Sequence, residues 1–297
     1  MSKKKIVIAG GTGLIGRSLA LHSQTLGHEV VTLSRRQSHH VIGRAARWDG
    51  RTVGPWKEEL VGADIVVNLC GANIGEGRWT PARKDEIRTS RIQPAQCLIA
   101  ALDEVGTRPK LLQASAVGFY GTGDTPMTET DEAGGDFLAE LAIEWEAQTA
   151  AYPGPWVTAR FGVILSPKGG VLPRLSLPFK LFVGGPLGSG NQWFSWVTLD
   201  DAVRAVMFAL DTDMVGPVNV VAPNPVTNRE LARTLGTVLH RPGRLPTPAF
   251  ALRTLLGEQA DLLLEGQRVL PQKLLEYGFN FDQATVLSAL QALLESR

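Results

Sequence analysis

The sequence predicts an α/β protein in which a Rossmann-type, doubly wound parallel sheet carries a smaller, mostly helical C-terminal lobe. A short apolar run at residues 5–9 leads into a glycine-rich turn and then into apolar residues at helical spacing. Up to residue 165, short apolar runs alternate with helical patterns, which is typical of a parallel sheet. After Ser166 the character changes, because glycine and proline become frequent over residues 167–195. Together these observations predict a sheet domain followed by a second lobe.

Composition excludes several classes of protein. The chain has 297 residues, 44% of them hydrophobic and 20% charged, with a formal net charge of +1. This near-neutral balance argues against a nucleic acid partner. Two cysteines, Cys70 and Cys97, are too few for a disulfide framework and indicate a reducing compartment. The basic start at residues 1–5 leads directly into a strand, so we expect a cytoplasmic protein with neither a signal peptide nor a membrane span.

The first turn carries glycines at positions 10, 13 and 16. Gly10 permits a tight turn after the strand, Gly13 lets a pyrophosphate approach the backbone, and Gly16 lets the helix pack closely on the strand. The free N–H groups and the positive end of the helix dipole then face the phosphates. Because strand, helix and next strand are all in place, we interpret the pattern as a dinucleotide-binding turn, rather than as an ordinary glycine-rich turn.

The second predicted strand, residues 29–33, ends in Ser34-Arg35-Arg36. About 20 residues after the glycine turn, NAD-binding proteins place an acidic residue against the ribose 2′-hydroxyl. This chain has a serine and two arginines there, which are suited to holding a 2′-phosphate. We therefore predict NADP(H) rather than NAD. The alternative is a pair of solvated arginines in a loop.

The remaining elements complete the sheet and the lobe. Further strands are predicted at residues 46–49, 63–70, 110–114, 156–165 and 218–221. Helices are predicted from Thr80-Pro81, from Pro94 to Leu102, over 136–151, over 200–210 with Asp200-Asp201-Ala202 as the cap, and over 227–239. The glycine-rich segment 167–195 is expected to cover the active-site edge, and the rest is mostly helical. We expect a cofactor-binding domain at 1–165, with 196–215 packing back on it, and a second lobe at 166–297.

Several segments carry a family resemblance. Residues 10–16, the fifth-strand motif 115–121 and the hydrophobic-Asp segment 194–202 resemble the extended short-chain dehydrogenase/reductases, or NAD-dependent epimerase/dehydratase superfamily. The closer resemblance is to the atypical sugar-nucleotide-epimerase-like, or SDR39U-type, subfamily. Its marks here are residues 68–71, 78–79, 90–91, 134–137, 145–146, 184–190 and 264–272, which span essentially the whole chain.

The resemblance implies a lobe that binds NADP(H) and a C-terminal lobe that closes over a substrate. It implies that Thr12, Leu14 and Ile15 lie in the turn, Ser34 and Arg35 at the 2′-phosphate, Leu69, Cys70 and Gly71 beside the cofactor, and Glu86, Arg91 and Arg160 around it as polar contacts. No metal is expected, since the pair His39-His40 has no nearby ligand partner in the sequence.

The usual catalytic set of the superfamily is absent. Typical members use a Ser or Thr, a Tyr-x-x-x-Lys pair and often an Asn. Aligned on Tyr120-Gly121 and Glu146, these positions fall on Ala116, Leu138, Ala142 and Arg91. We name Tyr120 and Ser115 as the candidate catalytic residues. The alternative for Tyr120 is a structural tyrosine that ends the fifth strand. Glu140 and Glu144 could substitute but resemble surface residues, and Cys70 is either a reactive thiol or inert packing.

Two functions therefore stay open. One is an NADP(H)-dependent oxidoreductase, monomeric or homodimeric, that transfers hydride to a small carbonyl substrate such as a flat ketone, quinone or enone. The other is a non-catalytic NADP(H)-binding regulatory or scaffold protein. An oxidoreductase would need a substrate pocket, and an aromatic group in the C-terminal lobe could shape it: Trp193, Phe194 and Trp196, with Gln192. In either protein the same side chains could instead pack in a core.

Overall fold

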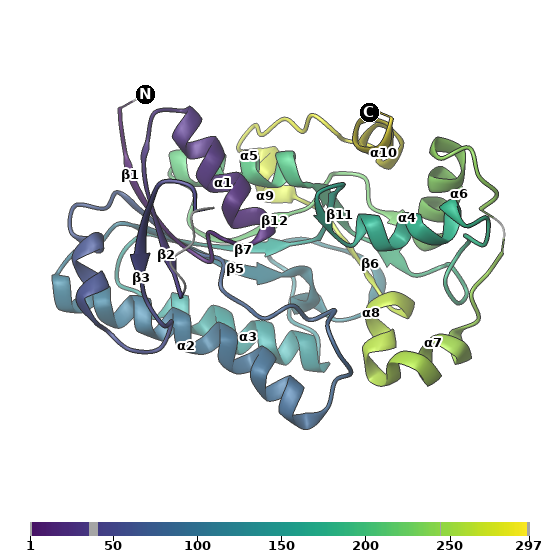
Figure 1. The fold of residues 1–297 in the computed structure, drawn as a ribbon, viewed down its shortest axis with the longest axis horizontal. Coiled ribbons are helices and arrows are strands. Elements are labelled where there is room, and N and C mark those ends of the chain that lie inside the picture. The colour runs from purple at the N-terminus through teal and green to yellow at the C-terminus, as the bar shows by residue number, and fades with distance from the viewer. Residues whose placement is uncertain (1, 36–40, 244, 296–297) are drawn as a thin grey trace.

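The computed structural model describes residues 2–35, 41–243 and 245–295. A seven-stranded sheet forms its centre, in the order β12-β7-β5-β4-β1-β2-β3 (Figure 1). Every neighbouring pair in this sheet is parallel. The strands are β1 (Lys5–Ala9), β2 (Glu29–Ser34), β3 (Arg44–Arg47), β4 (Ile65–Asn68), β5 (Lys110–Ala116), β7 (Trp156–Phe161) and β12 (Gly216–Val220). The chain runs outward from β1 in both directions, which confirms the predicted doubly wound sheet.

Helices cover both faces of the sheet. On one face lie α1 (Leu14–Thr25) and α5 (Leu199–Asp211), and on the other α2 (Pro81–Val105) and α3 (Phe137–Ala150) (Figure 1). Along β1, Ile8 packs in the cluster that includes α1 and α5, whereas Val7 packs in the cluster that includes the C-terminal half of α2. A strand buried on both faces needs a continuous apolar sequence, and this explains the run at residues 5–9.

A smaller, largely helical lobe lies to one side of the sheet, shown at the right of Figure 1. Its core includes Leu172, Trp196, Leu231, Leu235 and Leu290. Its elements are β8 (Val163–Ser166), β9 (Gly169–Gly170), α4 (Leu172–Lys180), β10 (Trp193–Phe194), β11 (Trp196–Thr198), β13 (Val226–Thr227), α6 (Asn228–Val238), α7 (Ala249–Leu256), the 3-10 helix η3 (Gly257–Ala260), α8 (Asp261–Leu264), β14 (Gln267–Val269) and α10 (Val286–Leu294).

The chain also carries short elements outside these two groups. They are η1 (Pro55–Leu60), η2 (Val117–Tyr120), β6 (Gly123–Met127) and α9 (Gln272–Glu276). Strand β6 pairs in parallel with β14, so the turn-rich region after β5 is tied to the C-terminal lobe. Neither of these two strands is predicted by the sequence, because each is short and lacks apolar alternation.

The predicted single strand over residues 156–165 is wrong. It divides at Gly162 into β7, which stays in the main sheet, and β8, which pairs in parallel with β11. A Cβ atom at Gly162 would lie 2.7 Å from the carbonyl oxygen of Ser195. The glycine therefore permits the close passage at which the chain leaves the sheet, although an apolar run alone does not show this break.

Two predicted helix starts are also wrong. Helix α2 continues through Pro94 as one helix, because the buried proline and its apolar neighbours pack against the sheet strongly enough to outweigh the missing hydrogen bond. Helix α5 is capped by Thr198, whose hydroxyl accepts from the N–H of Asp201 at 3.2 Å. Asp201 instead accepts from the N–H groups of Asp282 and Gln283, so it fixes a distant segment of chain.

Candidate functional site

The carboxyl ends of the parallel strands bring the predicted site residues to one edge of the sheet. In the strand register, Ala9 pairs with both Leu33 and Asn68. Farther along the sheet, Ser115 pairs with Arg160. The residues that follow β1, β2 and β4 therefore emerge beside the ends of β5 and β7. This is the edge at which open α/β sheets bind ligands.

The glycine turn has the geometry that close packing requires. Gly10 has a φ of +77°, and a Cβ there would lie 2.8 Å from the carbonyl carbon of Leu69. A Cβ at Gly16 would lie 2.3 Å from the Gly10 oxygen. Thr12 and Gly13 are both exposed at the tip of the turn.

Helix α1 opens toward this edge without a side-chain cap. Gly13 is its N-cap residue, the first turn contains no acidic side chain, and the first helical hydrogen bond runs from Arg17 N to Gly13 O at 2.9 Å. The N–H groups of Leu14, Ile15 and Gly16 therefore have no intrahelical acceptor. Glycines 169 and 170 of β9 lie next to the Leu14 side chain, so the C-terminal lobe reaches the mouth of this turn. Such a helix start favours an anion.

Strand β2 ends at Ser34, and the exposed Arg35 follows it. Arg36 lies outside the described residues. Burial raises the pKa of the Cys70 thiol to about 12, and the positive charge of Arg35 acts in the opposite direction on that pKa. In the strand register Leu33 and Asn68 flank Ala9, so Arg35, after β2, and Cys70, after β4, emerge on either side of the glycine turn.

Buried amides determine the course of the chain after β4. The side chain of Asn68 donates to Gln113 Oε1 at 2.9 Å and accepts from the N–H of Cys70 at 3.1 Å. Leu69 and Cys70 are half-buried. Gly71 follows at a position where a Cβ atom would lie 3.1 Å from Cζ of Arg91. The backbone therefore passes between the glycine turn and the Arg91 guanidinium.

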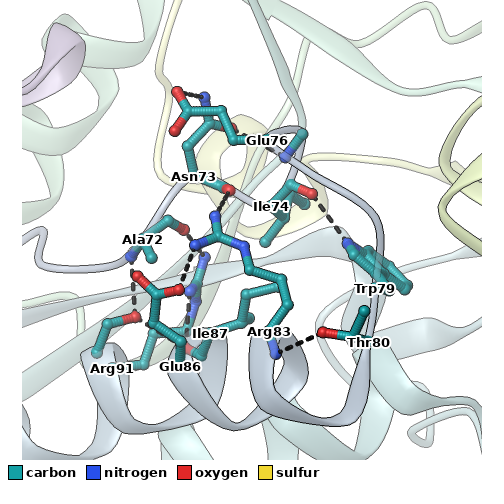
Figure 2. Close-up of polar contacts among 12 residues, drawn as sticks. Ala72, Asn73, Ile74, Glu76, Trp79, Thr80, Arg83, Glu86, Ile87 and Arg91 are labelled. Atoms are coloured by element: carbon teal, nitrogen blue, oxygen red, sulfur yellow. Dashed lines mark hydrogen bonds and ion pairs between the residues drawn. The ribbon is translucent and has the colours of Figure 1, made fainter. Parts of the chain in front are cut away.

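Arg91 is a half-buried cation without an acidic partner among the described residues. Its guanidinium donates to the carbonyl oxygens of Ile87 at 2.9 Å and Ala72 at 3.1 Å (Figure 2). It also lies 5.1 Å from the ring centroid of Trp145. Burial, with a smaller repulsion from Arg83, lowers the pKa of Arg91 to about 10, so the group is still charged at neutral pH. A cation held only by carbonyl oxygens and a ring is suited to an incoming anion.

Glu86 lies farther out on α2 and is exposed. It forms an ion pair with Arg83 at 2.6 Å, and Arg83 also donates to the carbonyl oxygen of Asn73 at 2.5 Å (Figure 2). Trp79 donates to the carbonyl oxygen of Ile74 at 3.0 Å. The Arg83 bond holds the loop 72–79 against α2, and the Trp79 bond closes the loop on itself. Glu86 contacts the loop through Arg83.

Ser115 and Tyr120, the candidate catalytic residues, belong to one buried polar network. Ser115 donates to Glu146 Oε1 at 2.6 Å, and Tyr120 donates to Asn219 Oδ1 at 2.7 Å. Arg160 joins the two halves, because it donates to the Tyr120 hydroxyl at 2.8 Å and to both Glu146 oxygens at 2.9 and 2.8 Å. Glu146 and Asn219 complete this network.

Glu146 and Asn219 are site residues that the sequence does not assign. Asn219 is a polar residue in a strand that is otherwise apolar after its first residues, and Glu146 lies two turns after Leu138 on the same helix. A polar residue in a buried strand, and an acid on the helix that faces the strand ends, are the signals that point to the network.

The electrostatics of the network favour fixed protonation states. Burial raises the pKa of Tyr120 to about 12, although Arg160 and Asn219 act against this rise. Burial alone would lower the pKa of Arg160, but hydrogen bonding and attraction to Glu146, with a smaller contribution from Tyr120, raise it overall. The Arg160 guanidinium also lies 3.4 Å from the ring centroid of Phe119. At neutral pH the phenol is therefore protonated and the guanidinium is charged.

Helix α3 carries the positions aligned with the usual Tyr and Lys. Leu138 and Ala142 occupy them, and neither side chain transfers protons. Leu138 packs over Gly118, where a Cβ atom would lie 3.2 Å from the Leu138 Cβ. An apolar contact therefore stands where a typical member has its general acid.

Two further observations concern the described residues as a whole. No group of three or more His, Cys, Asp or Glu side chains there is arranged to hold a metal ion; His39 and His40 lie outside that part of the chain. No helix in the described part of the chain combines the length and apolarity that crossing a membrane requires.

The fold and this edge define a Rossmann-type α/β protein with a dinucleotide-binding turn. The profile of the NAD dependent epimerase/dehydratase family matches residues 6–221, and the chain belongs to this family. A second profile, described as a domain of unknown function (DUF1731), matches residues 247–293.

Relatives and solved structures agree with this assignment. An epimerase family protein of Mycobacterium bovis is 41% identical over 98% of this chain and 97% of its own length. The SDR39U1 homolog of Arabidopsis thaliana, named as chloroplastic, is 40% identical over 99% of this chain and 88% of its own. The crystal structure of the human epimerase family protein SDR39U1 with NADPH matches with a TM-score of 0.90 and 31% identity, over 99% of this chain and 100% of that one. The resemblance to the sugar-nucleotide-epimerase-like subfamily is confirmed.

Proposed function

We propose that this protein is an NADP(H)-dependent oxidoreductase of the epimerase/dehydratase family that transfers hydride to or from a small carbonyl-type substrate. The observation that carries the proposal is the cation Arg35 directly after β2, at the place where an NAD-binding protein has an acid. The human relative, which shares the fold over the whole chain, was solved with NADPH.

The residues present fit NADP(H). The open first turn of α1, with Gly13 at its N-cap, would hold the pyrophosphate, and Ser34 and Arg35 would hold the 2′-phosphate. Leu69, Cys70 and Gly71 would line the cofactor along the end of β4. Arg91, Arg160 and Glu86 would surround it with polar groups. The cofactor itself supplies the hydride.

We infer that Tyr120 and Ser115 act as positioning residues rather than as proton donors. The hydrogen bonds of the Tyr120 and Ser115 hydroxyls go to partners inside the network. A phenol with a pKa of about 12 is poorly matched to proton transfer near neutral pH. Their role would be to fix the Arg160 guanidinium at the edge, while water supplies or accepts the proton of the reaction.

A non-catalytic NADP(H)-binding regulator is the second candidate, and Leu138 and Ala142 favour it. The two proposals differ in turnover. Steady oxidation of NADPH in the presence of a ketone, quinone or enone supports the oxidoreductase. NADPH binding without turnover across such a panel, together with a protein partner recovered only when NADPH is present, supports the regulator.

Calorimetric titration with NADPH, NADP+, NADH and NAD+ tests the cofactor assignment. Arg35→Ala is expected to weaken NADPH binding about tenfold or more, because it removes a charge-assisted hydrogen bond worth roughly 1.5–3 kcal/mol. NADH binding should change little. Arg108→Ala is the matched control, since Arg108 pairs with Asp103 before β5, at the opposite edge of the sheet. Equal affinity for NADH and NADPH, or an unchanged Arg35→Ala variant, contradicts the assignment.

We also propose a reducing, cytoplasm-like compartment. Cys70 and Cys97 are both free thiols. We expect a monomer or a homodimer, and measuring the mass of the protein in solution distinguishes the two.

A further inference from the structure

Arg268, on β14, is a second cation without a counter-charge. Its Nε atom is buried and has no hydrogen-bond partner. Among the described residues no carboxylate forms an ion pair with its guanidinium, and the acids that precede it in the sequence, Asp261 and Glu265, are paired with Arg253. The Arg268 guanidinium lies 4.6 Å from the ring centroid of Trp193. Partly buried charges are ordinarily paired, so this arrangement lacks an anion.

The backbone on both sides of Arg268 is fixed in place. The buried Ser195 hydroxyl donates to the carbonyl oxygen of Gln267 at 2.8 Å and accepts from the N–H of Val269 at 2.9 Å. The pairing of β14 with β6 shifts register between Gln267 and Arg268. Such an irregularity redirects the side chain that follows it. The backbone that carries Arg268 is therefore fixed before binding, so only side-chain torsions remain to be ordered when an anion binds.

The backbone of Trp193 is also tightly packed. Gly266 lies against its backbone, since a Cβ there would be 2.0 Å from the Trp193 oxygen. The neighbouring Gln192 donates through Nε2 to the carbonyl oxygens of Leu187 and Leu263, whereas its Oε1 is buried and has no partner. The ring, the guanidinium and an unused acceptor thus come from adjoining segments of the C-terminal lobe.

Arg268 is connected to the edge that would hold the cofactor. Val269 packs in one cluster with Val117 and Tyr120, just after β5. Asn219, which accepts from Tyr120, donates to the carbonyl oxygen of Leu270 at 3.0 Å. Arg268 is therefore two residues from a backbone group that the Arg160 network holds.

We propose that Arg268, supported by Trp193, binds an anionic oxygen group, a carboxylate or a phosphate, on the substrate; this rests on the proposed function. The planar guanidinium offers paired donors to such a group. The Trp193 ring would contact an adjacent apolar or planar part of the substrate. The expected substrate is thus a carbonyl compound that carries an acidic group.

Titration of the NADPH-saturated protein with benzoate, phenyl phosphate and neutral benzyl alcohol tests the proposal by calorimetry. Benzoate or phenyl phosphate is expected to bind, and the tighter of the two identifies the anion. Arg268→Gln should weaken that binding at least tenfold, whereas Arg268→Lys should retain part of it. Arg241→Gln is the matched control, because Arg241 also lies 4.6 Å from an aromatic centroid, that of Phe182, but on the outer surface of the lobe. Thermal melts establish that each variant is folded.

The remaining outcomes separate this inference from the proposed function. If NADPH binds and neither anion binds at about 10 mM, or if benzyl alcohol binds as well as benzoate, the anion site is wrong and the cofactor assignment stands. If Arg268→Gln weakens NADPH binding itself more than about threefold, Arg268 belongs to the cofactor site and the proposal is overturned. If NADPH fails to bind, the proposed function fails, and titration of the cofactor-free protein still compares Arg268→Gln with Arg241→Gln.

Discussion

Single residues at the site show how burial selects protonation states. Burial raises the pKa of Tyr120 and of the Cys70 thiol to about 12 each and lowers that of Arg91 to about 10. At neutral pH the phenol and the thiol are therefore neutral, and the guanidinium is charged. The edge thus offers cations and hydrogen-bond donors, which suit phosphate binding, but no activated base or nucleophile among these three groups.

Tyr120→Phe is expected to lower the free energy of unfolding by about 1–3 kcal/mol at pH 7, because the buried atoms Nη1 of Arg160 and Oδ1 of Asn219 lose their hydrogen bonds to the phenol. Folding raises the pKa of Tyr120 from 10.0 to about 12, so the folded state holds the proton more tightly. This stability is present below pH 10 and is lost as the pH rises to 12. Tyr120→Phe has no phenol to titrate and does not lose this stability. The difference in the free energy of unfolding between the wild type and the variant should therefore shrink by roughly 2–3 kcal/mol as the pH rises from 10 to 12.

Chemical denaturation at several pH values measures this change. Tyr277→Phe, at an exposed position, is the control for losing a phenol. If Tyr120→Phe instead abolishes turnover while NADPH binding is intact and the wild-type rate follows a group titrating near pH 7, Tyr120 is a catalytic residue and the positioning role is wrong.

The Cys70 thiol is expected to be unreactive in the native protein. With a pKa of about 12, only about one molecule in ten thousand carries the thiolate at pH 8. In a Cys97→Ala background, an aromatic disulfide reagent should label Cys70 roughly a thousandfold more slowly than a free cysteine, and at once in denaturant. Rapid native labelling that NADPH blocks would show instead that Cys70 is a reactive thiol.

Secondary-structure elements position these residues, and α3 illustrates how. Its N-cap, Asp136, accepts from the N–H groups of Leu138 and Ala139, both at 2.9 Å. Farther along, the helix presents Glu146 to Ser115 and Arg160. The cap therefore fixes the start of the helix that carries the acid of the polar network.

Asp136→Ala should lower the free energy of unfolding by about 1 kcal/mol, the usual cost of a lost N-cap. Asp136→Asn keeps an acceptor oxygen and should cost less. Thermal or chemical denaturation of both variants measures the difference. Equal losses would mean that the charge of Asp136, rather than its hydrogen bonds, stabilises the helix.

The sequence predicts the elements that have a simple periodicity. The glycine turn, the paired strands near it and the helix over 137–150 follow from local patterns, and so does the edge where their ends meet. The break at Gly162 and the continuity of α2 through Pro94 depend on packing between distant segments, which periodicity does not encode. The Arg160 network escaped prediction for the same reason, since its members come from five separate elements.

At the scale of the whole molecule, the loop 72–79 joins the sheet domain to the C-terminal lobe. Arg78 donates to the carbonyl oxygens of Thr254 at 2.7 Å and Leu255 at 2.8 and 3.0 Å, at the end of α7. Nearby, Gln259 donates to the carbonyl oxygen of Ile74 at 3.0 Å. Helix α7 has no buried residue, so apolar packing holds it only weakly. Together with the ion pair between Lys84 and Glu258, these polar contacts connect α7 and η3 to the cofactor-binding half.

Arg78→Gln should loosen α7 without affecting the sheet, because Arg78 satisfies carbonyl groups that the end of a helix leaves free. Hydrogen exchange read by mass spectrometry should rise several-fold in peptides over 249–260 and stay unchanged in β1, β4 and β5. Arg253→Gln is the matched control on the same helix, since its ion pairs with Asp261 and Glu265 are exposed and contribute little. If α7 in Arg78→Gln exchanges as slowly as in the wild type, the position of α7 does not depend on the Arg78 hydrogen bonds. Any closure of the lobe over a substrate would then use other contacts.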